Sequence, residues 1–301
     1  MLTQINGLHH VTTIGSDPRA IDRFWTETLG MRRVKKTVNF DAPDVYHLYY
    51  GDTVGTPGTA MTYFPFPDAR PGKRGTGEVG EVRLAIPHGA AGFWADRLGT
   101  QVVEDRFGAA SVRTEAPDGD VFALVEDDDP RTPYAATIDA ENAIRGFHSA
   151  TLRVADAAPT VELLRFMGYT EQARDGDTTR LIREGGTANL IDVVAAPDMP
   201  AAGQSAGSVH HIAFAVDNRA AQKEVQTALA EHGFQVTPQI DRDYFWAIYF
   251  RTPGGILFEV ATNEPGFDAD EPRETLGQAL KLPDQHEHLR DRLEKHLVPL
   301  G

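Results

Sequence analysis

Hydrophobic positions along the chain repeat one pattern of elements four times. The first copy opens with a strand-like segment at Gly7–Ile14, and a stripe of large apolar residues with helical spacing follows it. Ser16 or Asp17 can cap that helix, and Gly30 can end it in the left-handed conformation. Short apolar runs then continue to Phe66 and predict three more strands. The pattern therefore predicts a βαβββ unit.

Three further copies of this unit are predicted downstream. Their first strands are expected at residues 81–86, 146–152 and 207–216, and Asp217 is expected to cap the helix of the fourth unit. We therefore predict an α+β fold, in which four βαβββ units form two barrel-like domains. By chain order, units one and two occupy residues 1–130, units three and four occupy residues 144–268, and residues 269–301 form a tail with a helix at 285–297.

Two polar segments are expected to lie outside the units. Residues 126–134 combine a run of acidic residues with two prolines, which predicts an exposed linker. Residues 65–77 are rich in proline and glycine, which favours a surface loop near the mouth of a pocket.

Composition narrows the chemistry that these domains can carry. The 301 residues include no cysteine, which excludes disulfides, thiolate metal sites and cysteine nucleophiles. The net charge of −15 argues against nucleic acid and anionic membranes as partners. No apolar run approaches the roughly 20 residues of a membrane span, and the first residues do not resemble a secretory signal. We expect a cytoplasmic protein that acts on a small molecule, and a homo-oligomer is compatible with the sequence.

Equivalent positions in the four units hold different side chains, and this uneven use indicates a site. In the first strand of each unit, the position holds His10, Glu81, Ser149 and His211. In the last strand, the position compared lies six residues after the turn proline, which unit three lacks. The four units hold Tyr63, Ala123, Leu190 and Glu259 there. Two imidazoles and one carboxylate form the facial set of non-haem Fe(II) oxygenases, which leaves positions open for substrate and O2. We predict that His10, His211 and Glu259 hold Fe(II), with Mn(II) as a close substitute, and that nothing comparable surrounds Ser149 and Leu190.

Each predicted ligand histidine follows another histidine. Neighbouring residues of a strand point to opposite faces, so His9 and His210 are not expected to share the ligand direction. The second histidine is favoured because its face is expected inside a concave sheet, together with Thr12, Ile14, Ala213 and Ala215. In the alternative interpretation, local hydrogen bonds satisfy these histidines. A repeated histidine pair, together with a glutamate inside an apolar strand, weighs against that alternative, because an unpaired buried carboxylate is costly.

The distribution of the ligands predicts which units pair. One ligand lies in unit one and two lie in unit four. If units paired in chain order, His10 would belong to a different barrel from its partners. We therefore predict that units one and four surround the metal and that units two and three form a mainly structural partner.

The chain resembles the vicinal oxygen chelate superfamily, and more closely its ring-cleaving dioxygenases acting on hydroquinones and chlorohydroquinones. The resemblance covers nearly the whole chain, and its most specific segments are Gly7–Thr12, Val34–Phe40, Tyr46–Asp52, Pro57-Gly58 before Phe64–Phe66, Asp241–Ala261 and Leu280–Pro283. It implies an Fe(II)-dependent extradiol-type dioxygenase with His10, His211 and Glu259 as iron ligands. It also implies that the substrate is faced by His9, Thr12, His210, Arg242 and Tyr249.

General chemistry suggests roles for these side chains. A phenolic oxygen loses its proton more readily when it binds a metal, and His9, His210 and Tyr249 are candidates to accept that proton. Arg242 is always charged and can stabilise an anionic oxygen. In the alternative interpretation, Tyr249 packs within the sheet and Arg242 pairs with a neighbouring aspartate at the surface.

Other functions fit the sequence less well. A glyoxalase-type isomerase or lyase typically adds a fourth protein ligand, and the equivalent place here holds Tyr63. A thiol transferase acting on a small antibiotic shares the ligand types but consists of single pairs of units acting as dimers. A metal-free small-molecule binding protein would leave His10, His211 and Glu259 without a purpose. The expected partners are therefore a small aromatic substrate and O2.

Overall fold

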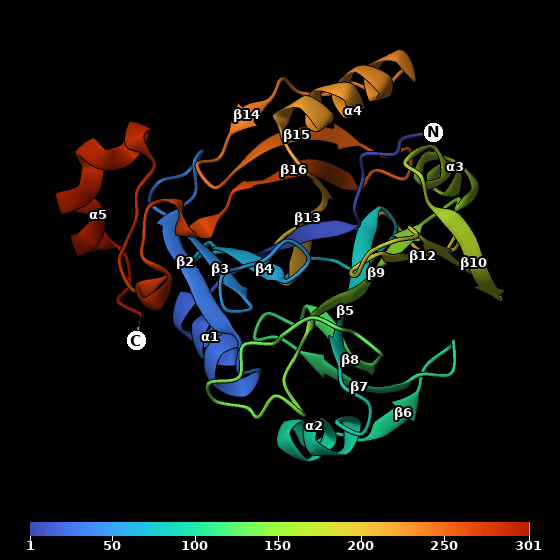
Figure 1. The fold of residues 1–301 in the computed structure, drawn as a ribbon, viewed down its shortest axis with the longest axis horizontal. Helices are drawn as coiled ribbons and strands as arrows, with labels where there is room; N and C mark the ends of the chain where they lie inside the picture. The colour runs from blue at the N-terminus through green and yellow to red at the C-terminus, as the bar shows by residue number, and fades with distance from the viewer. Residues whose placement is uncertain (301) are drawn as a thin grey trace.

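A computed structural model describes residues 1–300 and is drawn in Figure 1. Its fold consists of two eight-stranded sheets with few helices. The α+β fold class and the four βαβββ units are as predicted. The first unit contains β1 (Leu8–Gly15), α1 (Pro18–Arg23), β2 (Arg32–Val38), β3 (Tyr46–Gly51) and β4 (Ala60–Pro65). The second contains β5 (Glu78–Ile86), α2 (Ala91–Leu98), β6 (Val102–Glu104), β7 (Ala110–Glu115) and β8 (Val121–Glu126).

The third and fourth units repeat this order of elements. The third contains β9 (Gly146–Val154), α3 (Ala158–Phe166), β10 (Thr170–Asp175), β11 (Thr178–Ile182) and β12 (Leu190–Ala195). The fourth contains β13 (Ser208–Val216), α4 (Arg219–Glu231), β14 (Ile240–Asp241), β15 (Phe245–Arg251) and β16 (Leu257–Pro265).

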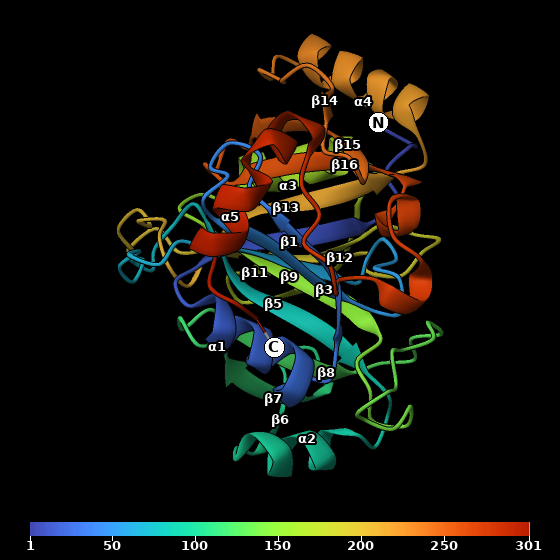
Figure 2. The same cartoon turned by 90° about the vertical axis from the view of Figure 1, so that its left-hand side faces the viewer.

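The first sheet joins the first and the last unit of the chain, and the second sheet joins the two middle units. The first sheet has the order β14-β15-β16-β13-β1-β4-β3-β2, so it contains the strands of units four and one. The second has the order β10-β11-β12-β9-β5-β8-β7-β6 and contains units three and two. Antiparallel pairing of β1 with β13 joins the two halves of the first sheet, which Figure 2 shows above β5 and β8. The domain boundaries at residues 130, 144 and 268 remain predictions.

The helices follow their sequence signals with two differences. Asp17 caps α1, but the helix widens into a π-helix at Phe24–Thr28 before Gly30, whose φ of +70° ends it. Asn218, and not Asp217, caps α4, because the Asn218 side chain accepts a hydrogen bond from the backbone N–H of Ala221. None of the helices in residues 1–300 combines the length and the hydrophobicity that crossing a membrane requires.

The tail lies beside β2 on the outer edge of the first sheet (Figure 1). The helix predicted at 285–297 is a 3-10 helix at Asp284–Leu289 followed by α5 (Arg290–His296), after two shorter 3-10 turns at Phe267–Ala269 and Arg273–Thr275. Lys35 of β2 is fully buried, and its ammonium group lies 2.6 Å from Asp270 and 2.5 Å from Glu271. This ion triad, in which Lys35 and Glu271 are buried and Asp270 is exposed, attaches the tail to the sheet.

The segment predicted as a surface loop at 65–77 pairs with a second loop. Isolated bridges join Pro71 to Ala206, Lys73 to Gly203 and Thr76 to Ala201. These two loops connect the sheets, and each contributes one side chain, Phe66 or Gln204, to the cavity described below.

Candidate metal centre and active site

Three side chains from three adjacent strands meet inside the first sheet. His10 lies on β1, His211 on β13 and Glu259 on β16, and all three are buried. The Nε2 atoms of the two histidines are 3.3 Å apart, and Glu259 Oε2 lies 3.4 Å from His10 Nε2 and 2.9 Å from His211 Nε2. Donors about 2.1 Å from a metal, at right angles to one another, would be about 3.0 Å apart. The three atoms therefore have the spacing of one face of an octahedron.

The charges in this cluster also fit a cation. Neither oxygen of Glu259 has a hydrogen-bond partner although the side chain is fully buried. Burial opposes ionisation of Glu259, but His10 and His211 hold its pKa well below the usual value. Burial lowers the pKa of His211, so that imidazole is neutral at pH 7 with a lone pair to donate. Deprotonated ligands around a buried carboxylate are the state that a metal ion binds. Within residues 1–300, no other group of three potential ligand side chains comes this close.

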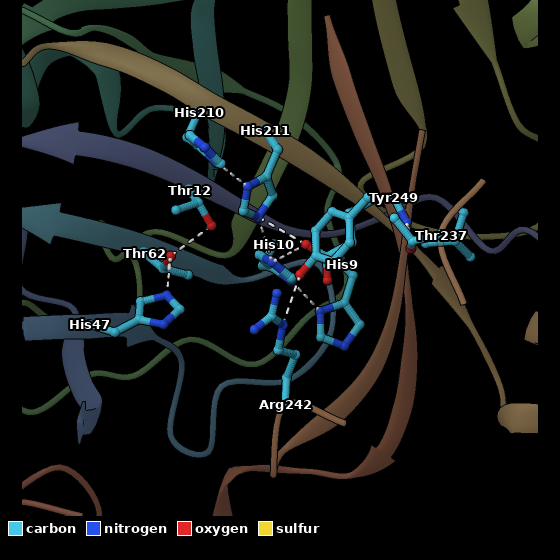
Figure 3. A network of polar contacts seen from close by, with 12 residues as sticks. His9, His10, Thr12, His47, Thr62, His210, His211, Thr237, Arg242 and Tyr249 are labelled. Carbon is cyan, nitrogen blue, oxygen red and sulfur yellow. Dashed lines mark hydrogen bonds and ion pairs between the residues drawn. The ribbon is translucent and has the colours of Figure 1, made fainter. Parts of the chain in front are cut away.

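The preceding histidines orient the two candidate ligands. His9 Nδ1 lies 2.9 Å from His10 Nδ1, and His210 Nδ1 lies 2.7 Å from His211 Nδ1 (Figure 3). When the Nε2 of a ligand histidine binds a metal, its Nδ1 must carry the proton, which it can donate to its neighbour. The neighbour then carries its own proton on Nε2. For His9 this Nε2–H donates to the carbonyl of Thr262 at 3.1 Å.

Two β-bulges explain why adjacent histidines can contact each other. Along the pairing of β1 with β13, the register shifts between Leu8 and His10, which leaves His9 as an extra residue. It shifts again between Thr12 and Thr13, where β13 carries His210 as the extra residue. A bulge interrupts the alternation of side chains. His210 therefore lines the same cavity as His211, contrary to the expected opposite faces, although only His211 belongs to the donor set.

The cavity beside the ligands has a volume of about 510 Å³. Of the predicted substrate-side residues, His210, Arg242 and Tyr249 line it, whereas His9 and Thr12 do not. His9 instead borders another, smaller cavity. The Thr12 hydroxyl is fully buried and bonds at 2.8 Å to the hydroxyl of Thr62. The structure thus brings three of the five residues to the cavity and leaves two behind its wall.

Tyr249 and Arg242 form a polar pair on one side of the cavity. The guanidinium Nε donates to the Tyr249 hydroxyl at 3.3 Å, and Arg242 also approaches Asp41 at 3.8 Å (Figure 3). Tyr249 lies directly opposite Glu259 in the pairing of β15 with β16, and its ring packs edge-on against His211 at 5.9 Å. Burial raises the pKa of Tyr249, so its hydroxyl is protonated at pH 7.

The assignment of Tyr63 and Leu190 as counterparts of Glu259, which came from counting along the chain, is wrong. Glu259 pairs with Ala213, two residues after His211, and the same step after His10 and Ser149 leads to Thr12 and Thr151. These pair with Thr62 and Asp192. The counterparts of Glu259 are therefore Thr62 in unit one and Asp192 in unit three.

Neither the residue first assigned in unit one nor the counterpart in unit three belongs to a second metal site. Tyr63, which the count had assigned, faces the core, where its hydroxyl donates to Asp120. Asp192 forms a buried two-point ion pair with Arg180, with both N–O distances at 2.7 Å.

Sequence reasoning missed several residues that line the cavity. They are Asn39, Phe40, Asp41, Ala42, His47, Tyr49, Phe64, Phe66, Gln204, Phe245 and Leu257, whereas Ile14 was expected on the concave face and does line the cavity. The only signal for some of them was membership of the segments Val34–Phe40, Tyr46–Asp52 and Phe64–Phe66, on which the family resemblance depends. The cavity walls are mainly aromatic and apolar, and Arg242 is the only lysine or arginine among the described residues that line it.

Comparisons with known proteins agree with this geometry. A family model described as "Glyoxalase/Bleomycin resistance protein/Dioxygenase superfamily" matches residues 7–260. The chain is 40% identical to "Putative ring-cleaving dioxygenase MhqO" of Bacillus subtilis, with 99% of this chain and 98% of that protein covered. It is 37% identical to a chlorohydroquinone/hydroquinone 1,2-dioxygenase of Sphingobium indicum, with 96% and 95% covered.

Solved structures share the fold. The crystal structure of a protein titled "putative dioxygenase" from Bacillus subtilis superposes with a TM-score of 0.96 at 39% identity, covering 99% of this chain and 98% of that one. Glyoxalase I from Zea mays superposes with a TM-score of 0.63 at 15% identity, covering 86% and 92%, which is a likeness of fold alone.

Proposed function

Because the chain belongs to the glyoxalase/bleomycin resistance protein/dioxygenase superfamily, we propose that it is a ring-cleaving dioxygenase. It opens the ring of a hydroquinone or a related dihydroxy aromatic compound and incorporates both atoms of O2. The observation that carries this proposal is a three-residue facial donor set on the wall of a cavity with aromatic sides. Three protein ligands leave coordination positions open on a metal, and a cavity of this size suits a small ring.

The relatives support the reaction type. Curated proteins between 35% and 40% identical to this chain, over nearly their whole length, are named for ring cleavage. The relative from Sphingobium indicum is named for hydroquinone and chlorohydroquinone as substrates.

We assign Fe(II) to the site, with Mn(II) as a substitute that the same donor set accepts. His10, His211 and Glu259 would hold the ion. A bound divalent ion lowers the pKa of a ring hydroxyl that it coordinates.

The chain's own residues prepare the cavity for a phenolic ring. Among the described residues, His210 Nε2 makes no hydrogen bond, and it carries a proton when Nδ1 accepts from His211. His210 therefore offers a donor to an oxygen of the substrate or of O2, and this is the opposite of the base role considered from the sequence. Arg242 and the Tyr249 hydroxyl offer a cation and a second donor beside it.

His9 and Thr12 act through other residues in this proposal. His9 connects ligand His10 to the backbone of Thr262, which fixes the plane of the imidazole. Thr12 lies behind the cavity wall, where its hydroxyl holds that of Thr62.

A glyoxalase-type isomerase or lyase is the second candidate, since the fold is shared. The place of a fourth protein ligand is Thr62, the counterpart of Glu259. Its hydroxyl is engaged by Thr12 and His47 at 2.8 and 2.9 Å. A fourth carboxylate or imidazole is therefore missing there, which favours the dioxygenase.

Anaerobic loading with Fe(II), followed by an oxygen-uptake screen over hydroquinones and catechols, tests the proposal. We expect stoichiometric O2 consumption and an open-chain product with at least one substrate. The Glu259→Gln variant serves as the matched control and should consume no O2 above background. An iron-loaded protein that consumes no O2 with any dihydroxy aromatic compound, but isomerises a hemithioacetal, would establish the second candidate instead.

A further inference from the structure

The segment Tyr46–Asp52 carries two polar side chains that the proposed mechanism does not use. His47 and Tyr49 are two residues apart on β3, so they share one face of the strand. Both line the cavity, and both are almost fully buried, with exposed fractions of 7% and 1%. Burying two polar groups in a cavity wall is unfavourable unless each has a partner. Their partners therefore indicate their purpose.

Tyr49 is the internal counterpart of Tyr249. Tyr249 pairs with Glu259 across β15 and β16, and Tyr49 pairs with Thr62, the counterpart of Glu259, across β3 and β4. β15 and β3 are each second from one end of the eight-stranded sheet. Both residues line the cavity, so two tyrosines face it from opposite flanks of the curved sheet.

The surroundings of the two tyrosines differ in a way that separates their roles. Tyr249 packs on ligand His211 and bonds to Arg242. The ring of Tyr49 packs on His47 at 4.0 Å and on Phe267 at 4.8 Å. Among the described residues, its hydroxyl bonds only to His47 Nδ1, at 2.8 Å. Tyr249 therefore contacts a ligand ring, whereas among the described residues no ring contact or hydrogen bond joins Tyr49 to His10, His211 or Glu259.

His47 holds the Tyr49 hydroxyl in place. Its other nitrogen, Nε2, bonds to Thr62 at 2.9 Å, and Thr62 bonds to Thr12, so a chain of hydrogen bonds runs behind the cavity wall (Figure 3). Burial lowers the pKa of His47 and raises the pKa of Tyr49, so both are neutral at pH 7. A phenolic hydroxyl can donate one hydrogen bond and also accept one. With one bond made to His47, Tyr49 keeps capacity for a second bond toward the cavity.

We propose that the Tyr49 hydroxyl binds the ring hydroxyl of the substrate that lies farthest from the metal, and that His47 is the positioning residue for Tyr49. This inference rests on the proposed function. In a hydroquinone the two hydroxyls are at opposite ends of the ring, so a metal that binds one cannot reach the other. The second hydroxyl gives up hydrogen bonds to water when the ring enters the cavity, and a tyrosine on the cavity wall that does not contact the ligands can replace one of them.

Anaerobic binding to the Fe(II)-loaded protein tests this without turnover. Calorimetric titration compares hydroquinone with phenol, which has the metal-binding hydroxyl but lacks the distal one. The variants are Tyr49→Phe and, as the matched control, Tyr46→Phe. Tyr46 is on the same strand, and its hydroxyl donates to the carbonyl of Val298 at 3.0 Å and does not line the cavity. Melting temperatures check that each variant is folded.

Wild-type protein should prefer hydroquinone over phenol, and Tyr49→Phe should reduce that preference about 3- to 30-fold. Phenol affinity should stay unchanged, and Tyr46→Phe should retain the full preference. His47→Phe keeps an aromatic ring against Phe64 but removes both nitrogens, so it should cause the same loss. The double variant with Tyr49→Phe should lose little more, because the two residues act as one unit. In oxygen-uptake assays, both single variants should raise KM for hydroquinone more than they lower kcat.

Two results overturn the inference while the proposed function stands. One is oxygen uptake with hydroquinone together with an unchanged preference in Tyr49→Phe. The other is an equal loss of affinity for phenol and hydroquinone. If the wild-type protein neither binds nor consumes O2 with any dihydroxy aromatic compound, the proposed function itself fails.

Discussion

Replacing Glu259 by Gln tests whether this buried carboxylate exists to hold a metal. The substitution preserves shape and removes the charge. Its oxygens have no hydrogen-bond partner in residues 1–300, and its nearest polar neighbours are the Nε2 atoms of His10 and His211. A Gln amide can donate to a neutral imidazole, so we expect the free energy of unfolding of the metal-free protein to change by less than about 1 kcal/mol.

The effect should appear when metal is added. A ligand at 100 times its Kd stabilises the folded state by about 2.7 kcal/mol, which corresponds to a rise in Tm of roughly 5 °C for a chain of this size. Wild-type protein should show that rise with Fe(II) or Mn(II) under anaerobic conditions. The Glu259→Gln variant should show almost none, because it keeps two neutral ligands and loses the only anionic one. Scanning calorimetry and metal analysis of the dialysed protein measure both quantities.

Asp192→Asn is the matched control because Asp192 is the counterpart of Glu259 in the second sheet. Asp192 pairs at two points with Arg180, so the substitution leaves a buried guanidinium without its partner. The metal-free variant should lose about 3 to 5 kcal/mol of stability but keep the full rise in Tm with metal. The two carboxylates thus have opposite expected outcomes. A Glu259→Gln variant that binds metal and gains stability as the wild type does would refute the assignment of this centre.

Three further predictions concern one residue of this centre and two outside it. Tyr249→Phe should leave the metal content and Tm unchanged and lower kcat/KM by about 10- to 1,000-fold, measured by oxygen uptake; full activity would leave Tyr249 as sheet packing. Burial raises the pKa of Asp120 from 3.8 to about 6, so its contribution to stability is complete below pH 3.8 and is lost as pH rises through 6. Between pH 4.5 and pH 7.5, Asp120→Asn should remove about 2 kcal/mol of this dependence, measured by urea unfolding at the two pH values; an unchanged pH dependence would exclude Asp120 as its source. Lys35→Met removes the cation from the ion triad with Asp270 and Glu271 and leaves buried Glu271 unpaired, so it should cost about 3 kcal/mol and expose residues 270–300 to limited proteolysis; an equally resistant tail would show that other contacts hold it.

The repeat and the uneven use of its positions were sufficient to predict the fold class and the three residues that meet in the first sheet. Both signals are local: glycines such as Gly30 end helices, and alternation marks strands. The pairing of β1 with β13 has no local signal, because those strands are about 200 residues apart. Its prediction came from the chemical requirement that ligands share one metal.

Counting residues from the turn proline did not find the counterpart of Glu259 in unit one, because the count includes a loop whose length differs between units. From Pro57 to Thr62 there are five residues, whereas from Pro253 to Glu259 there are six. A loop can gain or lose a residue without disturbing the sheet, because the register is fixed by hydrogen bonds between strands. This one-residue difference assigned Tyr63 to a place that Thr62 occupies, and so hid the chain of hydrogen bonds from Thr12 through Thr62 to His47.

The two histidine pairs show the limit of sequence reasoning most clearly, because the two dipeptides are identical but their first histidines lie in different surroundings. In both pairs a bulge allows the first histidine to bond to the second, but the two bulges lie on different strands. The His9 side chain donates a hydrogen bond to the carbonyl of Thr262, behind the site, whereas the His210 side chain lines the cavity. The neighbours that decide this come from distant strands, so no rule applied to the dipeptide alone can separate an orienting histidine from one that faces substrate. Assigning these two roles therefore requires the register of the sheet. Because a bulge interrupts the alternation of side chains, the first histidine of the same dipeptide can either orient the ligand from behind or face the cavity.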